Sequence, residues 1–199
     1  MMKCIEQDSL STRRSVYDLD DMLPVSENCF IETVENCLRH CPTPFNVQSA
    51  RLVILLHRYH LRFWDMTEKS LLKIAGEKSR SIHEKIAGFA AAHGTILFFE
   101  DSGALRSLKK QFPLYAGNMP IWVQQANGML QYMIWQALAE NDIGASLQHY
   151  NELIEADTAK WLELPKTWKM VAQMPFGNIK KNPAAKTFLP IEDRMMIFK

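Results

Sequence analysis

Residues 121–140, IWVQQANGMLQYMIWQALAE, decide the fold, because they predict one long helix that is apolar on more than one side. Pro120 precedes this segment, and proline is favoured in the first turn of a helix. A helix that is apolar nearly all round is buried, either centrally or against a second subunit. The apolar residues are Ile121, Trp122, Met129, Leu130, Met133, Ile134, Trp135, Ala137 and Leu138.

Helical and strand patterns alternate along the rest of the chain, which predicts a mixed fold of helices and sheet. Helices are predicted over 26–40, with Ser26 as N-cap, and over 67–92 as one or two helices. Strands are predicted over 51–57, 95–99 and 168–174, and the unbroken apolar run of the first indicates burial on both faces. The apolar tail, 194–198, is predicted as a fourth strand that pairs with another segment or with a partner chain.

The composition suits one domain that spans residues 1–199. Nearly half of the chain, 47%, is apolar, and 23 basic residues almost balance 22 acidic ones, so no strong field attracts nucleic acid or an anionic membrane. The longest apolar run, 52–56, is too short to span a bilayer. The acidic N-terminus lacks the apolar core of a secretion signal, so the expected location is the cytoplasm.

The chain has four cysteines, which are Cys4, Cys29, Cys37 and Cys41. They are expected to be reduced thiols, since a disulfide-rich domain would be shorter and use more of them. Cys37, His40 and Cys41 lie close together but lack the paired second half of a zinc module. His57 and His60 have a spacing that suits metal ligands on a helix, but their segment is predicted as strand and turn. No metal site is therefore expected.

Three polar segments carry groups that can hold an anionic or planar ligand. Residues 12–15, TRRS, offer two guanidinium groups and a hydroxyl to a phosphate or a heterocycle edge; a solvated basic pair is the alternative. Residues 41–49, CPTPFNVQS, form a turn stiffened by two prolines, in which Asn46 and Gln48 can face a ligand; the alternative is an ordinary loop. Residues 144–151, GASLQHYN, allow the backbone to approach a flat ligand.

These segments together resemble the nitroreductase family in order, spacing and residue type over nearly the whole chain. Residues 13–15 resemble the opening flavin-binding motif of the family, and 42–49 resemble its Pro-Ser-x-x-Asn-x-Gln loop. The resemblance is closest to a short subfamily of bacteria and fungi, on the evidence of 92–100 (AHGTILFFE), 127–131 (NGMLQ) and 144–151. A Walker loop, a GxGxxG turn after a strand and a GxSxG motif are all absent from the sequence.

The resemblance implies an α+β, nitroreductase-like fold, with helices around a central, mostly antiparallel sheet and a long buried helix at a dimer interface. It also implies a homodimer with two FMN sites between the subunits. In each site, one subunit would supply Arg13, Arg14 and Ser15 at the phosphate, ribityl chain and ring edge, and Ala145, Ser146 and Leu147 along the isoalloxazine, with a backbone N–H near N5. Gln125 would contact the ribityl chain or the ring. The other subunit would supply Pro42, Thr43, Pro44 and Asn46.

Two departures from the family pattern leave some roles open. Tyr17 stands where many relatives have a basic residue near the flavin pyrimidine, and Phe188 stands where many have an arginine. Lys186 or Arg194 is therefore expected to complete the phosphate grip. Lys85 is a candidate for the cation that would stabilise reduced flavin near N1 and O2.

The implied activity is that of an FMN-dependent NAD(P)H oxidoreductase that reduces nitroaromatic compounds or similar small oxidants by ping-pong hydride transfer. No protein nucleophile is needed, because the flavin supplies the difficult chemistry. Phe45, Phe112 and Tyr115 are candidates for a substrate pocket, with core packing as the alternative. A flavin-binding sensor with little turnover, or a dimeric scaffold that has lost FMN, are the competing functions. The sequence does not separate NADH from NADPH.

Overall fold

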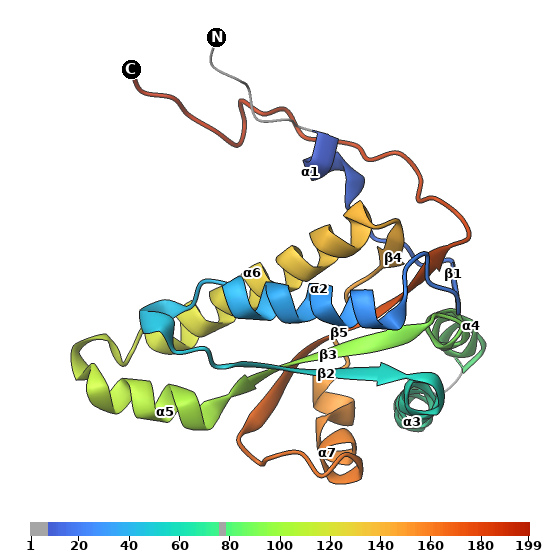
Figure 1. The fold of residues 1–199 in the computed structure, drawn as a ribbon, viewed down its shortest axis with the longest axis horizontal. Helices are drawn as coiled ribbons and strands as arrows, with labels where there is room; N and C mark the ends of the chain where they lie inside the picture. Colours follow the sequence, from blue (N-terminus) through green and yellow to red (C-terminus); the bar gives the residue numbers. More distant parts are fainter. Residues whose placement is uncertain (1–7, 76–78) are drawn as a thin grey trace.

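The structure is a computed structural model that describes residues 8–75 and 79–199 (Figure 1). Its helices are α1 (Asp8–Thr12), α2 (Glu27–His40), α3 (His57–Ala75), α4 (Ser79–Ala90), α5 (Ser102–Gln111), α6 (Met119–Glu140) and α7 (Asn151–Trp161), with short 3-10 turns at Pro44–Asn46 and Pro113–Tyr115. Its strands are β1 (Leu19–Asp20), β2 (Ala50–Leu56), β3 (Gly94–Asp101), β4 (Ile143–Ala145) and β5 (Trp168–Ile179).

The strands form one sheet in the order β1-β5-β3-β2, and β4 also pairs with β5. All these pairings are antiparallel, with Ala50 opposite Glu100 between β2 and β3, and Gly94 opposite Phe176 between β3 and β5. A parallel bridge joins Ser15 to Ala145 beside β4. The predicted α+β architecture, a mostly antiparallel sheet flanked by helices, is confirmed.

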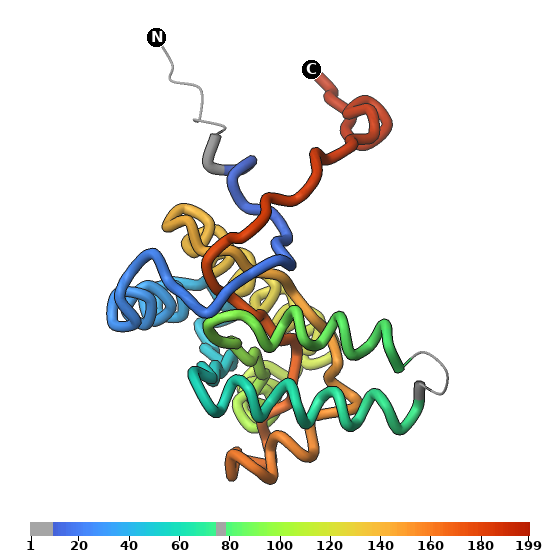
Figure 2. Tube along the Cα trace, turned by 90° about the vertical axis from the view of Figure 1, so that its right-hand side faces the viewer, coloured from blue at the N-terminus to red at the C-terminus, as the bar shows by residue number. Residues whose placement is uncertain are grey.

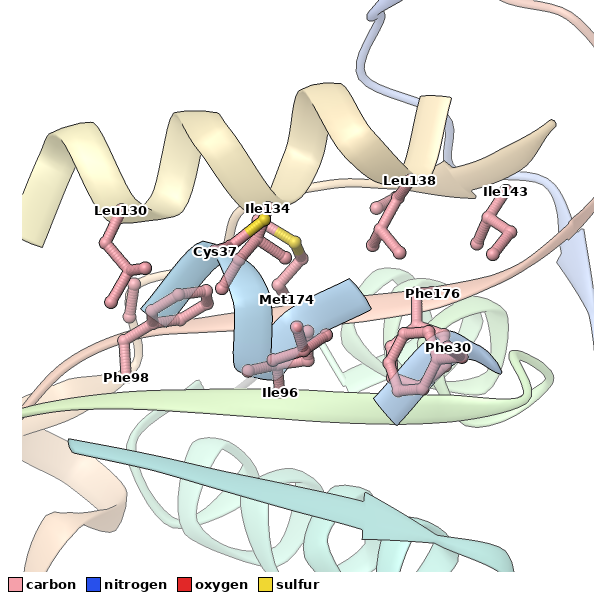
Figure 3. Close-up of a cluster of buried hydrophobic side chains, with 13 residues drawn as sticks. Phe30, Cys37, Ile96, Phe98, Leu130, Ile134, Leu138, Ile143, Met174 and Phe176 are labelled. Carbon is pink, nitrogen blue, oxygen red and sulfur yellow. The ribbon is translucent and has the colours of Figure 1, made fainter. Parts of the chain in front are cut away.

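Helices cover both faces of the sheet, with α2 and α6 on one side and α3, α4 and α7 on the other (Figure 1). The central strand β3 serves both cores, since Ile96 and Phe98 belong to the cluster under α2 and α6, whereas Leu97 and Phe99 belong to the opposite one. Figure 3 shows the first cluster between α6, α2 and the sheet. This two-sided burial confirms the strand predicted over 95–99.

Two helices begin as the sequence predicts. The Ser26 side chain caps α2 by accepting a hydrogen bond from the backbone N–H of Cys29 at 3.2 Å. Helix α6 carries Pro120 in its first turn and ends at Glu140, the predicted boundary. One side of α6 packs on the sheet through residues such as Leu130 and Ile134, and the other side leaves Met129 and Tyr132 each 44% exposed in the single chain.

Three predictions about local structure are wrong. Strand β2 is not buried on both faces, because it is the outer strand of the sheet, and only Leu55 among its residues is fully buried. Residues 57–60 do not form strand and turn; they begin α3, which starts immediately after β2 at His57 with a φ of 48°. Residues 194–198 do not form a strand in the single chain, because no neighbouring strand hydrogen-bonds to them; 180–199 extend away from the body (Figures 1 and 2).

The described cysteines, Cys29, Cys37 and Cys41, are free thiols, and Cys4 lies outside the described residues. Within 8–75 and 79–199, no cluster of three or more histidine, cysteine or acidic side chains has an arrangement that could hold a metal ion. No helix in the same ranges is long and apolar enough to cross a membrane.

His60 is buried in a neutral form that its neighbours specify. The Thr95 hydroxyl accepts a hydrogen bond from Trp64 Nε1 at 2.9 Å and lies 2.9 Å from His60 Nδ1, so its own hydrogen can be donated to that nitrogen. His60 Nε2 lies 3.2 Å from the carbonyl oxygen of Ala90, to which it can then donate. Burial lowers the pKa of His60 to about 4.

The protein should therefore lose stability in mild acid. Between pH 6.5 and about 4 the unfolded chain binds a proton at His60 that the folded chain does not, so the stability present above pH 6.5 falls as the pH decreases. From pH 7 to 5.5 this group alone should cost about 1 kcal/mol, measurable by urea unfolding at each pH. The decline should be shallower for His60→Gln, and an equal decline in both proteins would contradict this assignment.

Candidate functional site

A cavity of about 580 Å³ brings together three of the predicted cofactor-binding cations, Arg13, Arg14 and Lys186. The two arginines follow α1, and the lysine lies in the C-terminal segment after β5, so residues near both ends of the described chain line the cavity. The backbones of these two segments run close to each other (Figure 2). Three positive charges converging on one cavity suit a phosphate group. Phe188 also lines the cavity, whereas Arg194 is exposed and is not among its lining residues.

The guanidinium groups of Arg13 and Arg14 are held differently. Arg13 lies over the ring of Trp135 on α6, 4.4 Å from its centroid. Arg14 Nη2 donates to the carbonyl oxygen of Ala184 at 2.6 Å, a bond across 170 residues that fixes the segment beside Lys186. The Nε atom of Arg14 is buried without a hydrogen-bond partner among the described residues. Burial of a hydrogen-bond donor without a partner costs free energy. A ligand oxygen that accepts a hydrogen bond from this Nε would therefore stabilise the site.

Backbone contacts place Ser15 beside Ala145. The two residues form a parallel bridge, and the Val16 N–H donates to the Ala145 carbonyl oxygen at 2.9 Å. Trp135 Nε1 donates to the same oxygen at 3.2 Å. The N-terminal motif, the strand β4 and the C-terminal half of α6 therefore form one region, as the predicted site requires.

Within the predicted flavin-lining stretch, Leu147 is the accessible side chain. Ala145 and Ser146 are buried, and the Ser146 backbone N–H already donates to the Pro175 carbonyl oxygen at 3.3 Å. Gln148 Nε2 donates to Ser146 Oγ at 3.1 Å and holds this side chain inside the protein. Leu147 is half-buried and lies two residues after Ala145, which forms the bridge with Ser15.

A network missed by the sequence analysis fixes the end of this stretch. Gln173 on β5 accepts the Tyr150 N–H at 2.9 Å and donates to the Asn151 side chain at 2.6 Å, while its backbone exchanges two hydrogen bonds with Gln148. Gln173 is fully buried. Its signal in the sequence is a glutamine inside the otherwise apolar run 170–177, which indicates a buried polar group that needs partners.

The loop between α2 and β2 contains unusual backbone conformations. Phe45, Asn46 and Gln48 have φ values of 52°, 53° and 47°, in the left-handed region that residues other than glycine rarely adopt. Thr43 Oγ1 accepts the Gln48 N–H at 3.1 Å and helps to hold this shape. Strained residues of this kind cluster at functional sites, where the surrounding structure holds them.

The three predicted pocket aromatics meet at this loop. Phe45 stacks on Phe112 with their ring centroids 4.3 Å apart, and Tyr115 lies 5.8 Å from Phe45. Trp122, in the first turns of α6, completes the group at 6.4 Å from Phe45 and 6.0 Å from Tyr115. These rings are not core residues, because Phe45 is 47% and Tyr115 43% exposed. The sequence pattern predicts Trp122 only as part of the apolar helix and not as a member of this aromatic group.

The predicted cofactor-binding residues of the 42–46 loop, together with Gln125, lie on the outer side of α6. Pro42 and Gln125 line a cavity of about 500 Å³ together with Met129, Tyr132 and Met133. Pro44 and the exposed Asn46 lie in the adjacent 3-10 turn, which contacts α6. This cavity is nearly all apolar apart from Gln125 and the tyrosine hydroxyl.

The two groups of predicted residues are therefore separated along α6 in one chain. Gln125 lies with the residues of the 42–46 loop, and Trp135 lies beneath Arg13; the ten residues of helix between them correspond to about 15 Å. Lys85 joins neither group, since its Nζ lies over the rings of Phe89 and Tyr150, 5.8 and 5.7 Å from their centroids. Tyr17 is 57% exposed.

Comparison with known proteins shows similarity over most of the chain. The model of the nitroreductase family matches residues 10–178. HBN1 of Saccharomyces cerevisiae is 32% identical over 183 residues, which cover 91% of each chain. The structure of nitroreductase CinD from Lactococcus lactis with chloramphenicol has a TM-score of 0.89 and 42% identity, covering 96% of this chain and 98% of CinD. CinD has also been solved with nicotinic acid and with 4-nitrophenol.

More distant structures share the fold. A protein from Desulfovibrio desulfuricans, solved in complex with FMN, has a TM-score of 0.71 and 16% identity, and covers the whole of both chains. At this identity the similarity establishes the common architecture of sheet and helices.

Proposed function

The chain belongs to the nitroreductase family, whose fold supports an oxidoreductase role, and from this premise we propose that residues 1–199 form one FMN-binding domain that oxidises NAD(P)H and reduces small oxidants. We propose nitroaromatic compounds as the acceptor class. CinD, the similar protein, has been solved with chloramphenicol and with 4-nitrophenol, both of which carry a nitro group on an aromatic ring.

The observation that carries this proposal is the cavity at Arg13, Arg14 and Lys186. The cations fit a phosphate, and the buried, unpaired Nε of Arg14 fits an acceptor oxygen. Lys186 is the better candidate than Arg194 for completing the phosphate grip, since Arg14 holds the backbone at Ala184 next to it. Leu147 and Ser15, on the adjoining stretch, would contact the rest of the cofactor.

When bound, FMN supplies hydride acceptance from a nicotinamide and electron transfer to the oxidant. The described residues then have binding and orienting roles. The aromatic rings of Phe45, Phe112, Tyr115 and Trp122 offer flat apolar surfaces for a planar acceptor or a nicotinamide. CinD has been solved with nicotinic acid, which has the pyridine ring of a nicotinamide. One shared cavity for donor and acceptor gives ping-pong kinetics.

We further propose a homodimer that completes each site. Gln125 lies ten helix residues, about 15 Å, from Trp135 beneath Arg13, and Pro42 lines the same cavity as Gln125. We infer that Gln125 and the loop residues Pro42, Thr43, Pro44 and Asn46 serve the site of the other chain. A second chain packed on the exposed side of α6 would bring its own loop to the first chain's arginines.

The three described cysteines are free, which suits the reducing cytoplasm that we propose as the location of this protein.

The cofactor assignment is tested by the absorbance spectrum of the purified protein and by chromatography of the cofactor released by heat. The expected result is FMN, because the chain has phosphate-binding cations and no dinucleotide-binding turn for an adenosine. NAD(P)H should be oxidised steadily when a nitroaromatic acceptor is added. Recovery of FAD would contradict the proposed cofactor, and bound FMN without turnover would favour a flavin-binding sensor.

The oligomeric state is tested by light scattering at micromolar concentration. The expected result is a dimer, since Ile121, Met129 and Tyr132 on α6 and the apolar tail expose large side chains in the single chain. Obligate interfaces often bury more than about 2,000 Å² and resemble a divided core. A stable, flavin-loaded monomer would contradict the shared site.

A further inference from the structure

Trp135, in the C-terminal half of α6, contacts two of the segments that the proposed function assigns to the cofactor. Arg13 Cζ lies over the ring of Trp135, 4.4 Å from its centroid. The indole Nε1 donates a hydrogen bond to the Ala145 carbonyl oxygen at 3.2 Å. Both contacts are made within one chain, so they do not depend on how a second chain packs on α6.

The ring of Trp135 is the contact that orients Arg13. Within residues 8–75 and 79–199, the Arg13 side chain has no hydrogen bond and no ion pair. A guanidinium is attracted to the face of an aromatic ring, and tryptophan attracts it most strongly. The N–H donors at the edge of the guanidinium stay available to a phosphate. The ring therefore limits the freedom of Arg13 before a ligand binds, which lowers the entropy cost of binding.

The indole N–H holds the start of the stretch that is proposed to line the isoalloxazine. The Ala145 carbonyl oxygen accepts from the Val16 N–H at 2.9 Å as well as from Trp135. At the other end of the stretch, the Gln148 N–H donates to a carbonyl oxygen of β5 at 2.7 Å. Leu147, the accessible side chain, lies between these two attachments. One end of the stretch is thus held from α6 and the other from the sheet.

We propose that Trp135 is a positioning residue of the cofactor site, with a separate task for each part of its side chain. The ring face holds the Arg13 guanidinium ready for the FMN phosphate, and the indole N–H fixes Ala145 beside the flavin ring. A helix gives such a residue a rigid support. This inference rests on the proposed binding of FMN.

Two substitutions separate the two tasks, because Trp135→Phe keeps an aromatic face and loses the N–H, whereas Trp135→Leu loses both. Titration of the apo-proteins with FMN, followed by flavin fluorescence, should show binding to Trp135→Leu weakened by roughly 2- to 30-fold, the range that a cation–π contact supports. Binding to Trp135→Phe should stay much closer to that of the unmodified protein.

The same two substitutions in the Arg13→Ala protein distinguish positioning from general packing. Without the guanidinium the ring has nothing to orient, so the Phe and Leu variants should bind FMN equally. The effects of residues in contact are not additive, and this double-mutant cycle measures their coupling. A difference between Phe and Leu that is the same in both backgrounds would mean that Trp135 only fills the core, and it overturns the proposal.

Trp161→Leu is a matched control. Arg62 lies over the ring of Trp161, 4.7 Å from its centroid, in the same arrangement but on α7. This variant should bind FMN as the unmodified protein does, and thermal unfolding followed by circular dichroism reports the stability of each variant. If Trp161→Leu weakens FMN binding as much as Trp135→Leu, the effect is not specific to Arg13 and the proposal fails.

The task of the N–H is tested by the visible absorbance of bound FMN. In Trp135→Phe the Ala145 carbonyl oxygen loses one of its two donors, so the stretch beside the flavin ring relaxes and the absorbance bands should shift. A spectrum identical to that of the unmodified protein would overturn this part of the proposal.

A measurement without FMN separates failure of this inference from failure of the proposed function. In the NMR spectrum of the apo-protein, the Arg13 Nε–H signal, identified by its loss in Arg13→Ala, should lie upfield because of the ring current of Trp135. It should stay upfield in Trp135→Phe and move downfield in Trp135→Leu; a signal that does not move overturns the proposal. Absence of FMN binding in every variant, with this signal as expected, would instead contradict the proposed cofactor.

Discussion

Replacement of Phe176 by alanine should lower the free energy of unfolding by about 3–5 kcal/mol, the usual cost of truncating a fully buried phenylalanine. Phe176 has no exposed surface, stacks on Phe30 with ring centroids 4.2 Å apart, and lies in β5 opposite Gly94 (Figure 3). The ring also fills the space beside Gly94, where an added Cβ would be only 2.6 Å away. Its removal therefore leaves a cavity where α2 meets the sheet.

Urea unfolding of the two proteins, followed by circular dichroism, measures this loss. Leu114→Ala is the control, because Leu114 is 85% exposed and exposed substitutions usually change stability by no more than about 0.5 kcal/mol. A Phe176→Ala protein as stable as the control would show that this core does not have the packing described.

Arg13→Ala should weaken FMN binding by about ten- to a hundredfold, since a hydrogen bond to a charged group contributes roughly 1.5–3 kcal/mol. Arg13 lines the cavity proposed to hold the phosphate and lies over the ring of Trp135. The protein should remain folded and lose FMN on dilution. Excess FMN should restore much of the turnover, because Arg13 acts on the phosphate and not on the reacting ring.

Titration of the apo-protein with FMN, followed by flavin fluorescence, gives the two dissociation constants. Arg80→Ala provides a matched control, because the Arg80 side chain is 92% exposed and forms an ion pair with Glu84 on the same helix, α4. The control should bind FMN as the unmodified protein does. An unchanged dissociation constant for Arg13→Ala would remove this residue from the site and weaken the assignment of residues 13–15.

Local patterns in the sequence were sufficient to predict two elements, β3 and α6, whose burial matches the pattern of their apolar residues. Strand β3 is apolar on both faces because it lies at the centre of the sheet, and α6 was recognised by its apolar length and Pro120. The apolar run of β2 looks the same in the sequence, but its burial depends on its place at the sheet edge, which is a property of topology. The start of α3 at His57 was missed because no glycine or proline separates it from β2.

Residues of the candidate site were predictable where they belong to one short motif. They were not predictable where segments far apart in the sequence come into contact. Residues 13–15 and the aromatic group at Phe45 were identified from short segments, and the structure brings each group together. The bond from Arg14 to Ala184 spans 170 residues and has no local pattern. Nor does sequence show that Ser146 is enclosed while Leu147 remains accessible, since that depends on the pairing of β4 with β5.

The separation of the two residue groups along α6 has a genetic consequence. In the proposed dimer, each site takes the arginines of one chain and the loop of the other, so two variants that are impaired at different positions can complement each other. A chain with Arg13→Ala mixed with a chain altered at Asn46 forms heterodimers in which one site carries both defects and the other carries neither. At limiting FMN, co-expression of the two alleles would then recover part of the activity that either allele alone loses, whereas sites contained within single chains would stay impaired in every combination.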